Sequence, residues 1–283
     1  MAKIAVIGLC GNSIFMQVDH FHRPGETLAA HSVFEEIGGK GINQAVAAAR
    51  MGAEVSFLAA VGDDDTGKLC AQTAKDYGIN GHFAVKSGKK TTFAFILTDK
   101  DGDNRVTVFR QAELTVEDVR CFEQEIADSD ILLLQNEVPV EANDAAIALA
   151  KKHGVKVILN PAPARPIAPE TVRGIFAVTP NEQERQDLDI TLFENCITTL
   201  GKKGCSINDT ITIPALQVQA VDTTGAGDTF NGTLAVFLAE GKTLEDACRL
   251  AVTAAGCSVM KPHVLEAIPT KKDLERMINH DEI

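Results

Sequence analysis

Strand-like and helix-like segments alternate along most of this 283-residue chain, and this alternation restricts the fold more than any other feature. Short apolar runs typical of buried strands are followed by longer segments whose apolar residues recur every three to four positions. The clearest segments are the strand at Ile4–Ile7, the helix at Gly41–Met51, the strand at Val55–Val61, the helices at Thr66–Tyr77 and Glu141–His153, and the strand at Val155–Leu159. This order predicts an α/β fold with a mainly parallel sheet covered by helices on both faces. Ligands of such sheets bind at the carboxyl ends of the strands.

Two segments interrupt the alternation. Residues 15–36 contain Pro24-Gly25 and short alternating runs, and residues 91–110 are typical of two strands around a turn at 100–104. We expect both segments to form a small β-sheet lid that excludes water from a reacting centre. The alternative is a set of edge strands with no moving role. The core would then consist of residues 1–14, 37–90 and 111–283.

The composition is that of an ordinary globular enzyme, with 45% hydrophobic and 23% charged residues. The formal net charge of −12 argues against nucleic acids and anionic membrane surfaces as partners. No apolar run in the sequence is long enough to span a bilayer. Seven scattered cysteines without a C-x-x-C pair fit reduced thiols. Together these features predict a cytoplasmic protein.

A turn of small residues comes directly before an apolar-periodic helix. The amides of Gly225, Ala226 and Gly227 would crowd the start of that helix, and a helix N-terminus is a ready site for an anion. Asp228 would stand in the first helical turn. A carboxylate there could take a proton from a hydroxyl while the amides hold developing phosphate charge. The alternative is an ordinary glycine turn with Asp228 serving the helix dipole.

A second glycine turn, Gly38–Gln44, opens the first long helix. Gly39 permits close approach of the backbone to a ligand, and Lys40 and Asn43 bring polar groups beside it. The segment matches neither the Walker A loop nor the glycine fingerprint of dinucleotide-binding proteins. By itself it is also compatible with an ordinary turn.

Carboxylates follow two other apolar strands. Asn181 and Glu184 could share one face of a helical turn and hold Mg²⁺ through water, although a plain helix start accounts for them equally well. Glu137 follows the apolar run at 131–134, where its carboxylate could grip sugar hydroxyls or merely cap the next element.

Together these segments resemble the ribokinase-like (PfkB) family of carbohydrate kinases, from about the first strand to the last helices. The resemblance rests on five motifs in order: Gly38–Ala49, Asn160–Arg165, Asn181-x-x-Glu184, Thr199-Leu200-Gly201-x-x-Gly204 and Asp222–Asp228. It implies transfer of the ATP γ-phosphoryl group to a hydroxymethyl group of a sugar or sugar-like molecule. It also implies ATP and Mg²⁺ as cofactors.

The resemblance further implies roles for individual residues. Asp228 is similar in position to the family's base, and Gly225, Ala226 and Gly227 to its anion hole. The other implied roles are sugar binding by Gly39, Lys40, Asn43 and Glu137, magnesium and phosphate binding by Asn181 and Glu184, nucleotide binding by Thr199, Gly201 and Gly204, and binding of a monovalent cation such as K⁺ by Asp222 and Thr224. Because lid strands of relatives sometimes pair between subunits, the resemblance also implies a homodimer through the lid.

Four features depart from the family pattern. The loop after the first strand has no aspartate to grip the sugar; Asn12 is the polar residue that could bind there, which argues against ribose as the acceptor. Residues 185–195 leave a connection near the minimum for a parallel crossover. The loop at 261–267 lacks the Gly-Ala of the cation site, so K⁺ activation stays open. The segment at 109–114 lacks a glycine-asparagine pattern, and Arg110 there either adds positive charge near the acceptor or lies on the surface.

The function expected first is therefore an ATP-dependent sugar kinase. A nucleoside kinase is the near alternative, because the same scaffold accepts a ribosyl group that carries a base. A non-catalytic sugar or nucleotide sensor is the other, although Asp228 and the glycine turn argue against it. A nicotinamide-dependent oxidoreductase is excluded by the absence of a glycine fingerprint after the first strand.

Overall fold

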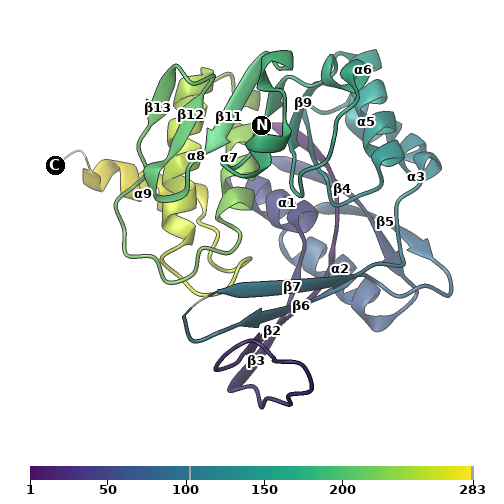
Figure 1. The fold of residues 1–283 in the computed structure, drawn as a ribbon. Coiled ribbons are helices and arrows are strands. Elements are labelled where there is room, and N and C mark those ends of the chain that lie inside the picture. The colour runs from purple at the N-terminus through teal and green to yellow at the C-terminus, as the bar shows by residue number, and fades with distance from the viewer. Residues whose placement is uncertain (102, 282–283) are drawn as a thin grey trace.

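The computed structural model describes residues 1–101 and 103–281, and within them the largest element is a nine-stranded sheet with the order β13-β12-β11-β10-β9-β8-β1-β4-β5 (Figure 1). Its strands are β1 (Lys3–Ile7), β4 (Glu54–Gly62), β5 (Asn80–Lys86), β8 (Ile131–Gln135), β9 (Lys156–Asn160), β10 (Ala177–Val178), β11 (Asn195–Thr199), β12 (Cys205–Ile207) and β13 (Ile211–Ile213). All neighbours from β5 to β11 are parallel, and the β11–β12 and β12–β13 pairs are antiparallel. The predicted, mainly parallel sheet is confirmed.

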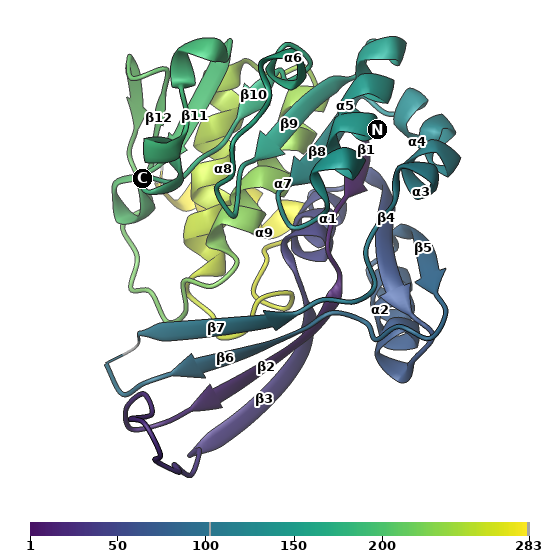
Figure 2. The same cartoon turned by 45° about the vertical axis from the view of Figure 1, so that its right-hand side comes forward.

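Helices cover both faces of this sheet, also as predicted (Figures 1 and 2). One face carries α1 (Lys40–Arg50), α2 (Asp65–Asp76), α7 (Ala226–Ala239), α8 (Leu244–Ser258) and α9 (Lys271–Asp281). The other carries α3 (Val116–Cys121), α4 (Glu123–Ala127), α5 (Val140–His153) and α6 (Pro169–Val172). Along β1, Ile4 and Val6 enter the first apolar cluster, whereas Ala5 and Ile7 enter the second. Strands buried on both faces read as continuous apolar runs, which is why they were recognisable in the sequence.

A separate four-stranded sheet lies beside the ends of the central strands (Figure 2). It has the order β3-β2-β6-β7, with β2 (Gly11–Gln17), β3 (Ser32–Gly38), β6 (Phe93–Thr98) and β7 (Asn104–Phe109). The strands extend beyond the predicted segment 15–36, since β2 already begins at Gly11. The prediction began too late because Gly11 and Asn12 are residue types typical of turns. Part of the predicted turn at 100–104, namely Gly102, lies outside the described residues.

The short connection between β10 and β11 contains two 3₁₀ turns, Glu184–Asp187 and Ile190–Leu192, where a longer chain would have room for a helix. The predicted short crossover is therefore confirmed. Leu188 and Ile190 pack against the second apolar cluster, which also includes Phe193. Single apolar side chains thus cover this part of the sheet.

Close packing of α1 against α7 determines which residues can meet near the sheet's carboxyl edge. A β-carbon added at Gly232 of α7 would lie 2.5 Å from the Gln44 carbonyl oxygen and 2.5 Å from the Ala47 side chain. A β-carbon at Gly41 would lie 2.6 Å from the backbone of Gly8, at the end of β1. The two helices therefore meet backbone to backbone, and α1 rests directly on the first strand. None of the helices in the described ranges has both the length and the apolar character that crossing a lipid bilayer requires.

We predict that Gly232→Ala lowers the free energy of unfolding by about 1–3 kcal/mol, because overpacking must push α1 and α7 apart. Gly227→Ala is the matched control in the same helix, since an added β-carbon there meets nothing within 4 Å. This control should be neutral or stabilising by up to about 1 kcal/mol, because alanine has the higher helix propensity. Urea unfolding of both variants measures the difference. Equal stabilities would contradict the packing argument.

Candidate functional site

A cleft of about 650 Å³ opens at the carboxyl ends of β9, β10 and β11, beside the first turn of α7. Its size is that of an ordinary small-molecule site. It brings together ten of the sequence-predicted residues: Lys40, Asn181, Glu184, Thr199, Gly201, Gly204, Gly225, Ala226, Gly227 and Asp228. The turns that carry them are far apart in the chain and meet because parallel strands end at one edge of the sheet.

The first turn of α7 presents backbone donors to this cleft. Gly225 precedes the helix with a left-handed φ of 76°, which turns the chain sharply into the helix. In the described part of the chain, the amides of Gly225, Gly227 and Asp228 have no protein acceptor. The amide of Ala226, one of the three predicted donors, is directed at the Thr223 carbonyl at 3.3 Å. The free amides at the start of α7 are therefore a partly different set from the predicted three, and they include the N–H group of Asp228.

The Asp228 carboxylate is held by two side chains of α1. Asn43 donates from Nδ2 to Asp228 Oδ2 at 2.9 Å, and Gln44 donates from Nε2 to Oδ1 at 2.9 Å. Gln44 also donates to Asn160 Oδ1 at 3.2 Å and accepts from Gln135 Nε2 at 2.7 Å. Asp228 lines the cleft while its side chain is fixed from behind, which orients both oxygens. Gln44 is not among the site residues predicted from the sequence, although its position next to Asn43 in the first turn of the helix is a signal that could have identified it.

Lys40 balances the negative charge of the site. Attraction to Asp228 raises the pKa of the Lys40 ammonium, burial opposes this, and Glu137 and Glu184 add to the increase. Glu137 accepts a hydrogen bond from the Lys40 amide at 2.8 Å. Burial raises the pKa of the Glu137 carboxyl, and attraction to Lys40 and Arg110 only partly offsets the effect. The charge of Lys40 is therefore stabilised by carboxylates from α7, from the β8–α5 turn and from the Asn181–Glu184 turn.

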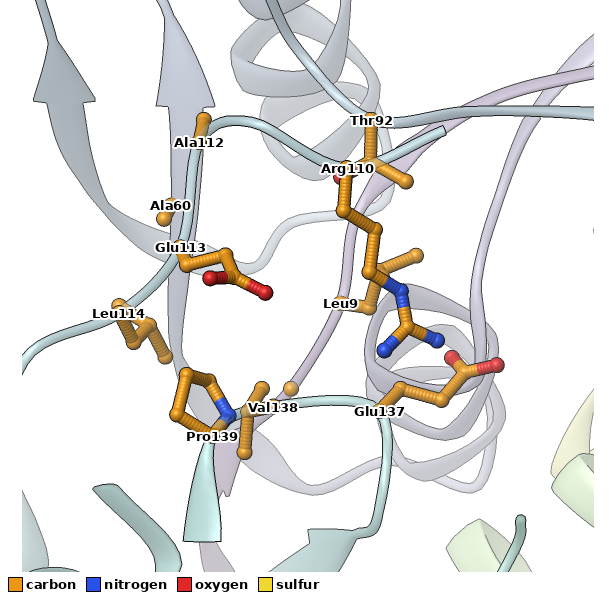
Figure 3. A pocket seen from close by; sticks show the side chains of 11 residues that line it. Leu9, Ala60, Thr92, Arg110, Ala112, Glu113, Leu114, Glu137, Val138 and Pro139 are labelled. Atoms are coloured by element: carbon orange, nitrogen blue, oxygen red, sulfur yellow. The ribbon is translucent and has the colours of Figure 1, made fainter. Parts of the chain in front are cut away.

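Glu137 borders a second, smaller cavity of about 20 Å³ (Figure 3). The guanidinium of Arg110 points toward the Glu137 carboxylate, and Leu9 and Glu113 lie around the same space (Figure 3). Arg110 is an exposed surface residue, and it also puts positive charge beside Glu137, so both interpretations of this residue hold. Gly39 lies next to the same space, because a β-carbon there would come within 2.8 Å of the Leu9 carbonyl oxygen.

Asn12 lines neither cavity. Its Nδ2 donates to Glu35 Oε2 at 2.9 Å, across the β2–β3 pair. Ser13 points to the opposite face of the small sheet, since successive residues of a strand alternate. A β-carbon at Gly38 would lie 2.7 Å from the Ser13 hydroxyl oxygen, so Ser13 lies close to the glycine turn that opens α1. The strand register therefore puts the Asn12 side chain on the same face of the small sheet as Glu35, and the sugar contact expected of Asn12 stays a prediction.

Asn181 and Glu184 hold each other's backbone. Asn181 Oδ1 accepts from the Glu184 amide at 2.8 Å, and Glu184 Oε2 accepts from the Asn181 amide at 2.9 Å. This leaves Glu184 Oε1 available at the cleft. The described residues contain no group of three or more His, Cys, Asp or Glu side chains that could hold a metal by themselves. One or two carboxylates with substrate phosphates and water are what Mg²⁺ usually takes, so the residues fit that ion.

Asp222 and Thr224 lie just before Gly225 and the first turn of α7 and line neither cavity. The Thr224 amide donates to Asp222 Oδ1 at 2.9 Å. This local bond shapes the entry into α7 and leaves the second Asp222 oxygen without a hydrogen-bond donor in the described part of the chain.

The far wall of the cleft is apolar and was not recognised from the sequence. It consists of Ala215, Leu216, Val218, Val252, Ala255, Gly256 and Val259. A β-carbon at Gly256 would lie 2.8 Å from Leu216 Cβ, so α8 and the segment after β13 lie close together there. The periodicity of α8 identified its buried stripe but could not show that part of the stripe faces a cleft.

Because the folded-state pKa of Glu137 is raised, the folded protein keeps this proton at pH values where the unfolded chain, with a pKa near about 4.3, has lost it. The free energy of unfolding should therefore fall as the pH rises from that value through the raised pKa. We predict that Glu137→Gln removes this decrease and makes the protein more stable than wild type at about pH 8. Urea unfolding across this pH range tests it. The control Glu275→Gln, at an exposed position of α9, should follow the wild-type curve, and a Glu137→Gln curve parallel to it would contradict the prediction.

Comparisons with known proteins show the family to which the chain belongs. The model of the pfkB family carbohydrate kinase matches residues 1–271. A ribokinase from Haemophilus influenzae is 36% identical over 98% of this chain and 98% of its own length. A ribokinase structure from Thermotoga maritima has a TM-score of 0.90 and 34% identity, covering 99% of this chain and all of that one. A ribokinase from Arabidopsis thaliana complexed with ribose and ATP has a TM-score of 0.87 and 27% identity, covering 98% and 99%. The chain belongs to the PfkB family of carbohydrate kinases.

Proposed function

We propose that this kinase transfers the γ-phosphoryl group of ATP to a hydroxymethyl group of a sugar, with Asp228 as the general base. The observation that carries the proposal is the Asp228 carboxylate, held by Asn43 and Gln44 next to unbonded amides at the start of α7. A base and an anion site side by side are what in-line phosphoryl transfer needs, since positioning and charge neutralisation do most of the work. A sensor would need no such base.

The nucleotide fits the large cleft. The apolar wall around Leu216 and Val259 suits a purine ring, and Thr199, Gly201 and Gly204 form the polar turn beside it. The phosphates would then reach the amides of Gly225, Gly227 and Asp228. The structure of the Arabidopsis relative is of that protein complexed with ribose and ATP, which supports ATP as the nucleotide.

Magnesium would be held by Glu184 through water and by the phosphates, and its chemistry would be to neutralise charge on the transferred group. Asp222 and Thr224 remain the proposed start of a monovalent-cation site, with K⁺ as the candidate ion. Asn181 supports Glu184 through its side-chain oxygen.

The acceptor would bind between the two cavities, with Gly39, Lys40, Asn43 and Glu137 around it. Asn43 Oδ1 is buried without a hydrogen-bond partner in the described chain, as expected of a group that awaits a hydroxyl. Asn12 donates a hydrogen bond to Glu35, and no carboxylate directly follows the first strand. The contacts with the sugar would therefore differ from those of family members that have an aspartate there. The acceptor is therefore proposed as a sugar without further restriction to ribose. We also propose the cytoplasm as the compartment, since it supplies ATP.

We predict that Asp228→Ala lowers phosphoryl transfer by about 10²–10⁴-fold while ATP binding stays largely intact, because the variant loses the base and keeps the amides. ATP consumption with a panel of pentoses, hexoses, sugar phosphates and nucleosides measures this and identifies the acceptor. Asp76→Ala, at the exposed end of α2, is the control and should keep wild-type turnover. Undiminished transfer by Asp228→Ala would refute the assignment of the base.

We propose that the four-stranded sheet is a lid and that two copies pair through it. The pairing register puts Phe93, Phe95 and Phe109 on one face of that sheet. The Phe93–Phe109 ring centroids are 4.9 Å apart and those of Phe93 and Phe95 are 5.5 Å apart. Phe95 is 39% exposed and Phe109 41% exposed, which is unusual for clustered aromatic side chains. Exposed apolar clusters of this kind favour an interface.

We predict that the wild-type protein is a dimer in solution and that Phe95→Asp is a monomer, because a buried unpaired carboxylate would disrupt the shared apolar surface. Light scattering after size-exclusion chromatography gives the mass directly. The control Val85→Asp changes an exposed apolar residue of β5, in the other sheet, and should stay dimeric. A monomeric wild-type protein at micromolar concentration would rule out this interface.

A further inference from the structure

Strand β3 of the small sheet contacts the C-terminal loop, which we define as residues 261–267. The Glu36 carboxylate accepts a hydrogen bond from the Val264 amide, with distances of 3.2 Å to Oε1 and 3.4 Å to Oε2. The Phe34 ring lies over the His263 imidazole, with centroids 3.9 Å apart and an angle of 32° between planes. Phe34 and Glu36 are two residues apart in a strand, so one face of β3 makes both contacts.

The same loop contacts the anion-binding turn. Val264 is 5% exposed, and a β-carbon added at Gly225 would lie 2.4 Å from Val264 Cγ1. The Val264 side chain therefore occupies the space beside the Gly225 α-carbon. Gly225 is the residue from which α7 and its free amides begin. A shift of Val264 would release Gly225 and change the direction of those amides.

The backbone of the C-terminal loop needs outside support. His263 has a φ of 70°, in the left-handed region that L-residues other than glycine rarely adopt. A residue keeps this left-handed conformation only where several surrounding contacts hold it, and such residues are often found at functional sites. Here the surrounding contacts come from Phe34 and Glu36, both outside the loop.

Glu36 is a charged residue type in a partly buried position, where it accepts a hydrogen bond from a backbone amide. Within the described residues it forms no ion pair with a lysine, arginine or histidine. Burial raises its pKa, the bond from Val264 and the nearby His263 oppose this, and Asp222 adds to the increase. The Glu36 carboxylate is therefore partly buried without an ion-pair partner in the described part of the chain. Its hydrogen-bond partner is Val264, and the loop of Val264 contacts the turn at Gly225.

We propose that Glu36 is a positioning residue of the phosphoryl-transfer site: through Val264 it holds the C-terminal loop against Gly225 and so sets the direction of the α7 amides. The position of β3 is thereby coupled to the anion site, and a lid displaced from the loop leaves that site loosely formed. This inference rests on the proposed function of the α7 amides.

The test measures the anion site without requiring the acceptor to be known. Calorimetric titration of the full-length protein gives the affinity for Mg·ADP with and without beryllium fluoride, which mimics the γ-phosphoryl group. We expect the fluoride to tighten ADP binding in wild type. In Glu36→Leu this enhancement should fall at least about tenfold while the affinity for ADP alone stays within about twofold, since one factor of ten corresponds to the loss of a modest interaction.

Three further variants make the test specific. Glu36→Gln should restore most of the enhancement, because its amide oxygen can still accept from Val264. Glu35→Leu changes the neighbouring carboxylate on the opposite face and should match wild type. Phe34→Ala removes the ring contact with His263 and should lower the enhancement, which keeps the test decisive if Glu36→Leu does not fold.

The possible outcomes separate the two proposals. An enhancement in Glu36→Leu equal to that of wild type would overturn the positioning role and leave the proposed function standing. A loss in Glu36→Gln as large as in Glu36→Leu would also overturn it, because the hydrogen-bond acceptor is retained. Absence of any enhancement in wild type would contradict the anion site itself, and with it the proposed function.

Discussion

The contact between α1 and α7 is the interaction on which the candidate site depends. Gly232 lets the two helices approach so closely that an added β-carbon would lie 2.5 Å from the Gln44 carbonyl oxygen, and Asn43 and Gln44 of α1 lie within hydrogen-bond distance of Asp228. A larger residue would keep the apolar cores on both faces of the sheet but separate the carboxylate from its donors. A packing constraint in the core therefore fixes the position of a polar group at the surface of a cleft.

The overall negative charge of the chain opposes the binding of an anionic ligand, so the positive potential needed for binding must be local. A chain with a net charge of −12 must attract and hold a polyanionic nucleotide. In the proposed function the cleft does so locally, with the free helix amides of Gly225, Gly227 and Asp228 and with the ammonium of Lys40. Main-chain dipoles add no net charge, and one ammonium adds a single positive charge; in the proposed function both stabilise the phosphates.

The small sheet has two different faces. One carries Phe34 and Glu36 and meets the C-terminal loop, and the other carries the exposed aromatic cluster around Phe93. Asn12 and Ser13, adjacent in the sequence, belong to opposite faces for the same reason. Strand alternation thus separates contacts with the core from contacts that a second subunit could make, and it puts Asn12 on the face opposite to Glu36.

The sequence by itself determined the α/β layering, the positions of the main helices and the turns that carry Asp228, Lys40 and Glu184, because periodicity and turn chemistry are local properties. It even predicted the short crossover after Glu184, since that follows from counting residues. Only the tertiary structure decided which side chains meet. Asn43 and Asp228 are 185 positions apart, and Glu36 and Val264 are 228 apart. The role of Gln44, the orientation of Asn12 and the apolar wall near Leu216 depend in the same way on strand register and helix packing, which join distant segments and leave no periodic signal in the chain.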